Sequence, residues 1–263
     1  MKITKSNSIL RFACALLAVL TVVVSLPLFA VESKAEDETA AISHSVDFSA
    51  GTVDTALSAN PTINGVTFSN FQGAPKYATN DGKTVLYGAN GCFTVTTDVP
   101  DLAGTKFFVE TRLNVTQLGT ESLSLIALNL KTSSTATSAA TPLVRLKVDE
   151  TLEMRGSDSK YVSTETTMSL NDWHTVKAVV DTSTKMVELY LDGELVKELA
   201  MVNIYSMSSI RFMHNKSGST WYMDTVRYGV GDGNMESGET PEEPEEPKVP
   251  IMASALYNEF ISF

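Results

Sequence analysis

The segment Lys185-Met-Val-Glu-Leu-Tyr-Leu-Asp-Gly-Glu-Leu-Val196 decides the fold of this 263-residue chain. Its apolar residues Val187, Leu189 and Leu191 alternate with other residues, which is the period of a β-strand that is buried on one face. Asp192-Gly193 then separates this strand from a second apolar run, and an Asp-Gly pair in that position is a strong signal for a tight β-hairpin. We therefore expect two antiparallel strands joined by a two-residue turn.

The same two-residue period recurs across residues 42–230. It is clearest in four further runs, at 107–115, 143–148, 176–180 and 210–213. Turn signals separate the runs at Asn80-Asp81-Gly82, Asn90-Gly91, Asp149-Glu150 and Asp181 to Thr184, and residues 131–140 have the composition of a loop. Many short strands with frequent turns predict an all-β domain of two antiparallel sheets, packed as a sandwich or barrel.

Two further stretches carry a family resemblance. Asn171-Asp-Trp-His-Thr-Val-Lys-Ala-Val-Val-Asp181 precedes the first segment, and Thr220-Trp-Tyr-Met-Asp-Thr-Val-Arg-Tyr228 lies near the end of the domain. Together they resemble the concanavalin A-like superfamily, and its laminin G-like domains in particular. The resemblance implies a jelly-roll β-sandwich whose concave sheet or rim binds sugars in some members. It also implies a calcium ion in many members, although this fold hosts many unrelated activities.

The N-terminal segment has the three parts of a secretory signal peptide. A basic start is followed by a run without charged residues at 12–30, and then by small residues at Ser33 and Ala35. We expect a signal peptide at 1–35 that is cleaved after Ala35, with Ala30 as the second choice. The alternative is an uncleaved membrane anchor, because the apolar run approaches the length of a bilayer span. Cleavage predicts a secreted or surface-attached bacterial protein, of the Gram-positive type.

Composition divides the remaining chain into four parts. Residues 36–41 are an acidic lead-in, 42–230 carry the strand pattern, 231–250 form a Gly/Glu/Pro-rich linker, and 251–263 are a short tail. Proline stiffens such a linker and its glutamates repel one another, so it should behave as an extended spacer. Because spacers usually join modules, we interpret the tail as the stub of a larger surface protein, with a short docking peptide as the alternative.

Charge and cysteine content argue against several classes of partner. The net charge is −11, and basic residues outnumber acidic ones in the predicted leader, so the rest of the chain is more acidic still. Such a surface argues against nucleic acid, whose phosphates need basic partners, and against anionic membranes. After the leader Cys92 is the only cysteine, so no intramolecular disulfide can form, and we expect this thiol in the core.

The acidic residues do not have the spacing of a glycosidase. Hydrolysis needs two carboxylates that flank the sugar bond, roughly 5–10 Å apart, and the resemblance implies three acidic residues spaced two apart on one strand. The nearest clusters here fall at hairpin turns instead: Glu188, Asp192 and Glu194, and Asp149, Glu150 and Glu153. The three histidines have no zinc-site spacing. We therefore expect a domain without catalytic residues, and a calcium ion is suggested by the resemblance alone.

The loop that follows the run at 210–213 is the best candidate for a ligand contact. Sugar binding needs a flat aromatic face and side chains that hydrogen-bond to hydroxyls. His214, Asn215, Trp221 and Tyr222 supply both kinds of group. The alternative is that Trp221 packs in the core as part of a strand.

Three arginines complete the candidate set. Arg112, Arg145 and Arg211 fall on the polar sides of predicted strands, with Tyr161 and Tyr190 available. If these sides coincide, the arginines form a basic patch suited to an acidic polysaccharide, and the resemblance includes lyases that use such residues. The alternative is that they are ordinary surface charges.

We therefore favour a non-catalytic carbohydrate-binding or adhesion module whose partner is a poly- or oligosaccharide. The first alternative is a polysaccharide lyase, or the accessory domain of a larger glycan-degrading enzyme. The second is a protein-binding laminin G-like domain. Trp173 and His174 are expected to be structural, with Trp173 in the core, because their family counterparts are.

Overall fold

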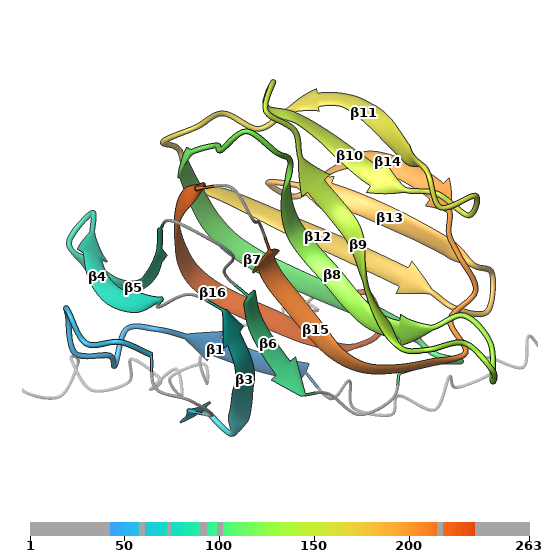
Figure 1. The fold of residues 1–263 in the computed structure, drawn as a ribbon, viewed down its shortest axis with the longest axis horizontal. Coiled ribbons are helices and arrows are strands. Elements are labelled where there is room, and N and C mark those ends of the chain that lie inside the picture. The colour runs from blue at the N-terminus through green and yellow to red at the C-terminus, as the bar shows by residue number, and fades with distance from the viewer. Residues whose placement is uncertain are drawn as a thin grey trace, which may run out of the picture. The chain divides into compact units, whose positions relative to one another are not determined.

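The computed structural model describes residues 43–57, 61–72, 75–89, 94–98, 102–214 and 218–234 (Figure 1). All the regular secondary structure within these ranges is β-strand, so the predicted all-β class is confirmed. The predicted leader, the tail, most of the linker, Cys92 and Asn215 lie outside the described residues.

Eight strands form the first sheet, and every pair in it is antiparallel. Their order is β14-β13-β12-β7-β16-β5-β4, and β1 also pairs with β16. The strands are β1 (Ser43–Asp47), β4 (Lys76–Asn80), β5 (Lys83–Gly88), β7 (Lys106–Gln117), β12 (His174–Asp181), β13 (Met186–Leu191), β14 (Glu194–Ala200) and β16 (Thr220–Val230).

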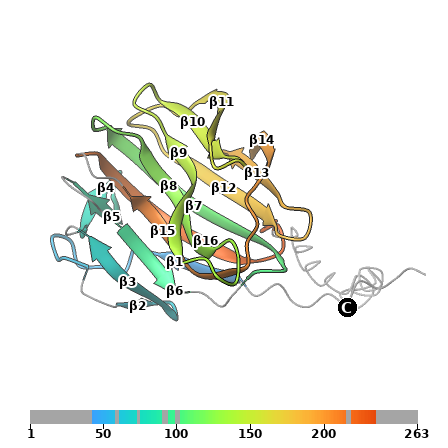
Figure 2. The ribbon, with the colours of Figure 1, turned by 45° about the vertical axis from the view of Figure 1, so that its right-hand side comes forward.

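The second sheet also has eight strands, in the order β11-β10-β9-β8-β15-β6-β3-β2. Figure 2 shows β8, β9 and β15 as a layer over β7, β12 and β16 of the first sheet. The strands are β2 (Thr62–Ile63), β3 (Val66–Gln72), β6 (Thr94–Asp98), β8 (Leu123–Lys131), β9 (Ala139–Leu146), β10 (Thr151–Arg155), β11 (Tyr161–Thr167) and β15 (Ser206–His214). The predicted sandwich of two antiparallel sheets is confirmed.

The predicted alternation on β7 places its apolar residues in the core. Phe107, Val109, Leu113 and Val115 are all buried there, between the two sheets. Phe108, on the opposite side of β7, is also buried, although it lies outside the core. A Cβ on Gly233 would lie 2.5 Å from the Phe108 ring, so the chain just after β16 packs closely over it.

Two of the predicted turns form as the sequence indicates, whereas Asn90-Gly91 lies outside the described residues. Asp192 and Gly193 join β13 to β14 with φ values of 52° and 89°, and positive φ at both residues is what a type I′ hairpin turn requires. At the turn between β12 and β13, Asp181 Oδ1 accepts hydrogen bonds from the backbone N–H groups of Ser183 and Thr184. These bonds and that of the Ser183 hydroxyl lower the pKa of Asp181 to about 2.

Large and flexible side chains fill the space between the sheets. Met201, Met207, Met213 and Met223 are buried, as expected for residues that adapt to irregular gaps. Trp221 on β16 is fully buried beside Gly88 of β5, where a Cβ would lie 2.3 Å from the indole. Glycine at position 88 therefore leaves the room that the indole occupies.

Candidate functional site

The structure separates the candidate residues into three places. Arg145, Arg211 and His214 belong to the second sheet. Alternation with buried neighbours puts Arg145 and Arg211 on its outer face, away from the core. Arg112 and Tyr222 lie on the outer face of the first sheet. The core of the sandwich lies between these two groups, so the predicted single basic patch does not form.

Trp221 occupies the third place, the core itself. Its side chain is 0% exposed, so it has no ring face to offer to a sugar. The alternative interpretation, in which Trp221 packs as part of a strand, is the one that the structure supports. We therefore leave Trp221 out of the candidate site.

A shallow hollow lies on the outer face of the second sheet. Its volume is about 240 Å³, and it collects side chains from β8, β9, β11, β15 and the β7–β8 loop. Residue pairing explains how strands distant in sequence meet here, since His214 pairs with Ser124, Ser124 with Arg145, and Arg145 with Glu153. The lining consists of Glu121, Ser122, Ser124, Pro142, Arg145, Tyr161 and His214.

Arg145 is held on two sides within this hollow. Its Nε and its Nη2 each lie 2.6 Å from Oε2 of Glu153, which faces it on β10. Its guanidinium also lies 3.3 Å from the centroid of the Tyr161 ring, in a cation–π contact. Glu153 therefore compensates the charge of Arg145, and the ring face of Tyr161 beneath the guanidinium is covered.

Ser124 is the unusual member of the lining. Its side chain is only 6% exposed, and its Oγ has no hydrogen-bond partner among the described residues. A buried hydroxyl without a partner costs about 1–3 kcal/mol, so native proteins rarely keep one without a reason. Buried polar atoms without a partner also occur at Asn80, Asn114, Arg155 and Arg211, but of this set only Ser124 lines the hollow.

His214 reaches the hollow through a break in the alternation of β15. Phe212 and Met213 are consecutive and both buried in the core. Met213 has a φ of 54°, a backbone conformation that few residues other than glycine adopt. The next residue, His214, then lines the hollow.

Around Arg112, side chains on the outer face of the first sheet contact one another. Arg112 forms an ion pair of 2.5 Å with Asp224 and lies 4.7 Å from the ring centroid of Trp173. The Trp173 indole in turn donates a hydrogen bond of 2.9 Å to Asp81, at the tip of the β4–β5 hairpin. The prediction that Trp173 fills the core is wrong, because the residue precedes β12 and is half-buried on this outer face.

Two other predicted residues belong to this sheet. Tyr222 packs against Tyr87, with ring centroids 5.1 Å apart. His174 is structural, as expected: its Nδ1 lies 2.7 Å from Asp192 and its Nε2 lies 3.0 Å from Ser169. These contacts tie the start of β12 to the β13–β14 turn.

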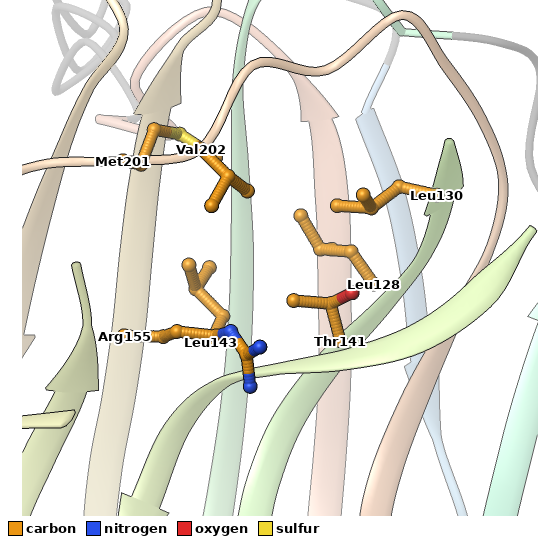
Figure 3. Close-up of a pocket in the computed structure, with 7 residues that line it drawn as sticks. All are labelled: Leu128, Leu130, Thr141, Leu143, Arg155, Met201 and Val202. Carbon is orange, nitrogen blue, oxygen red and sulfur yellow. The ribbon is translucent and has the colours of Figure 1, made fainter. Parts of the chain in front are cut away.

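Two further spaces lie elsewhere in the described part of the chain. The cavity in Figure 3 has a volume of about 10 Å³ and mostly apolar walls, so it holds a water molecule at most. An acidic hollow of about 240 Å³ lies on the first sheet, where Glu188 and Glu198 face each other on neighbouring strands. The lining of the small cavity is Leu128, Leu130, Thr141, Leu143, Arg155, Met201 and Val202.

Metal-ligand clusters and membrane-spanning helices would be further functional features of the described part of the chain. Among the described residues, no group of three or more His, Cys, Asp or Glu side chains could hold one. In the same part of the chain, no helix is long and apolar enough to cross a membrane.

Sequence reasoning missed the centre of the hollow. Ser124 lies in the run Leu123-Ser-Leu-Ile-Ala-Leu128, where a single serine in a buried strand is the only signal. Glu121 and Pro142 carried no signal that sets them apart from other loop and strand residues. For Tyr161 the sequence indicates no more than an available aromatic side chain.

Comparison with known proteins supports the fold. No family model matches the chain, and no curated protein does. Among solved structures, the Trypanosoma rangeli sialidase in complex with sialic acid matches with a TM-score of 0.53 at 10% identity, over 70% of this chain and 30% of that one. The chain therefore spans less than a third of the length of the sialidase.

Two further structures are less similar. The cellulose induced protein Cip1 matches with a TM-score of 0.49 and 13% identity, over 70% of this chain and 96% of that one. A carbohydrate esterase from the Shiga toxin-encoding bacteriophage phi24B matches with a TM-score of 0.45 and 10% identity, over 63% and 90% of the two chains. At these identities the likeness shows the fold alone, a β-sandwich of two antiparallel sheets.

Proposed function

We propose that this domain is a non-catalytic carbohydrate-binding module, and that the hollow on the second sheet is its binding site. The observation that carries the proposal is the hollow of about 240 Å³ on the outer face of the second sheet, where Arg145, Tyr161 and His214 meet. A sugar presents many hydroxyls and therefore needs several donors and acceptors fixed in position. Arg145 and Tyr161 hold each other in place, so their positions are set before a ligand arrives.

The carboxylates of the hollow favour binding over hydrolysis. Glu121 is the carboxylate among the lining residues, and the nearby Glu153 is engaged by two nitrogens of Arg145. A glycosidase needs one carboxyl group to donate a proton and a second to act as base or nucleophile. A carboxylate whose oxygen already accepts hydrogen bonds from a guanidinium is not free to contact a sugar bond or a water molecule in either role.

One observation favours a second candidate function. Arg145, Tyr161 and His214 meet in the same hollow. These are residue types that polysaccharide lyases use in the concanavalin A-like superfamily, which the sequence resembles. A lyase would need a positive charge to neutralise the carboxylate of a uronic acid, and Glu153 already compensates Arg145. Incubation with alginate and polygalacturonate distinguishes the two functions, since a lyase produces an unsaturated sugar with ultraviolet absorbance and a binding module does not.

A glycan array, run with and without calcium, tests the binding function directly. We expect binding to a defined set of glycans, and we expect His214→Ala to weaken it because that side chain lines the hollow. Tyr222→Phe is the matched control on the other sheet and should bind as the parent does. Absence of binding to every glycan, or equal binding by His214→Ala, contradicts the proposal and favours a protein-binding laminin G-like role.

We also propose that the module is exported and belongs to a larger surface protein. The basic start with an apolar run in the predicted leader, and the Pro/Glu-rich composition of 231–250, support this. Expression of the full chain in a Gram-positive host tests it. We expect secreted protein whose first residue is Glu36, and retention of an intact leader in the cell fraction would contradict the proposal.

A further inference from the structure

We infer that one edge of the Arg145 guanidinium binds two neighbouring oxygen atoms of a glycan, and that Glu153 is the positioning residue that sets the direction of this edge. This inference rests on the proposed function and deepens it, because it names the contacting group and the ligand chemistry. Glu153 itself does not line the hollow, so its role is exerted through Arg145. The contacts of the guanidinium on its other sides support the inference.

The ion pair with Glu153 uses only the side edge of the guanidinium. Nε of Arg145 donates a hydrogen bond of 2.6 Å to Oε2 of Glu153, and Nη2 lies 2.6 Å from the same oxygen. A guanidinium carries five N–H donors in a fixed planar fork. The contact with Glu153 therefore leaves the end edge, which consists of Nη1 and the second hydrogen of Nη2, for another acceptor.

The end edge of Arg145 is accessible to a ligand. Among the described residues, Nη1 has no hydrogen-bond or ion-pair partner. It is also not one of the buried side-chain atoms that lack a partner, in contrast to the Oγ of Ser124 in the same wall. The Arg145 side chain is 28% exposed and lines the hollow. A ligand in the hollow can therefore reach this edge.

Two neighbours fix the guanidinium before a ligand arrives. The Tyr161 ring centroid lies 3.3 Å from it, and this contact restrains the plane of the group. Glu153 then restrains its direction, because the two residues face each other in register on β9 and β10 and the Glu153 side chain is only 12% exposed. A side chain that is already fixed loses little conformational entropy on binding, so the arrangement favours affinity.

The end edge of a guanidinium matches two oxygen atoms that lie side by side. Its two parallel N–H donors form directional bonds to such a pair, which the single ammonium group of a lysine does not reproduce. Glycans supply this pair of acceptors in two ways, as hydroxyls on adjacent ring carbons or as the carboxylate of a uronic acid. The chemistry that Arg145 recognises is common to both.

A concentration series on an array of neutral and uronic acid oligosaccharides tests the contact. Arg145→Lys keeps the positive charge and removes the fork, so apparent affinity should fall about 10- to 100-fold. Arg227→Lys is the matched control and should bind as the parent does, because Arg227 lies 2.7 Å from Glu110 in a similarly shielded ion pair on the first sheet. The class of oligosaccharide that the parent binds identifies the source of the two oxygen atoms.

The array also separates the inference from the proposed function. If the parent binds a glycan and Arg145→Lys binds it equally tightly, the inference is overturned and the proposed function stands. If the parent binds none of the oligosaccharides, the proposed function fails, and with it the glycan contact of Arg145.

Two variants of Glu153 test the positioning role. Glu153→Gln and Glu153→Ala both lack the negative charge, but only glutamine keeps an oxygen that can accept from Arg145. On the same array Glu153→Ala should therefore bind roughly 2- to 10-fold more weakly than Glu153→Gln. In ¹⁵N spectra of the full chain, the Arg145 Nε–H signal should persist in Glu153→Gln and be lost to exchange with water in Glu153→Ala. Equal affinities and equal Nε–H signals in the two variants would overturn the role of Glu153.

Discussion

The outer faces of the two sheets have similar sequence patterns but differ in how their side chains contact one another. On the first sheet, charged and aromatic side chains contact one another: Arg112 with Asp224, Arg227 with Glu110, Lys177 with Asn234 and Tyr87 with Tyr222. On the second sheet, the pair of Arg145 with Glu153 borders a hollow in whose wall a buried hydroxyl has no partner. Polar residues on a strand therefore do not define a site, and an accessible space among them is the better guide.

The core that separates the two faces gives the largest expected effect. Trp221→Ala should lower the free energy of unfolding by about 3–5 kcal/mol, because it leaves a cavity between the sheets. Urea denaturation measures the change. Affinity per folded molecule should remain that of the parent, and a selective loss of glycan binding by a stably folded variant would show that Trp221 belongs to the site after all.

The two ion-paired arginines compare the faces directly. Arg112→Ala and Arg145→Ala each leave a largely buried carboxylate without its partner, since Asp224 and Glu153 are only 15% and 12% exposed. Each change should cost about 1–3 kcal/mol of stability. Only Arg145→Ala should also weaken glycan binding, as measured by calorimetry. Loss of binding in Arg112→Ala with retention in Arg145→Ala would move the site to the first sheet.

Acid sensitivity is the smallest expected effect and concerns the turns that support both sheets. Hydrogen bonds lower the pKa values of Asp149 and Asp181 to about 2, below the ordinary value of 3.8. Their contribution is therefore present above pH 3.8 and is lost as the pH falls through about 2. We expect the urea midpoint to fall between pH 4 and pH 2, and Asp181→Asn to reduce that dependence. An unchanged pH profile in this variant would contradict the role of the turn.

Much of the fold follows from the sequence because its causes are local. Alternation of apolar residues fixes which side of β7 and β13 faces the core, and Asp192-Gly193 fixes the turn that follows β13. Sheet membership is not local. Arg112 and Arg145 have similar sequence surroundings, yet β7 pairs with β16 in one sheet and β9 pairs with β8 in the other. The predicted basic patch failed for this reason.

The two tryptophans show the same limit at single residues. The sequence suggests a core position for Trp173 and leaves Trp221 open between a ligand contact and the core. The structure buries Trp221 in the core and leaves Trp173 half-buried on the outer face of the first sheet. Trp173 comes just before His174, which pairs with Leu113, so the indole falls on the face that carries Arg112. Ser124 could not be singled out either, because the absence of a hydrogen-bond partner is a property of the surrounding fold.

Amide chemical-shift mapping tests most directly which face binds the glycan. A ¹⁵N-labelled domain is titrated with the best ligand from the array while two-dimensional spectra are recorded. The account predicts that the largest shifts occur at Ser122, Ser124, Arg145, Tyr161 and His214, around the hollow of the second sheet. Shifts concentrated at Tyr87, Arg112, Tyr222 and Asp224 on the first sheet would contradict it.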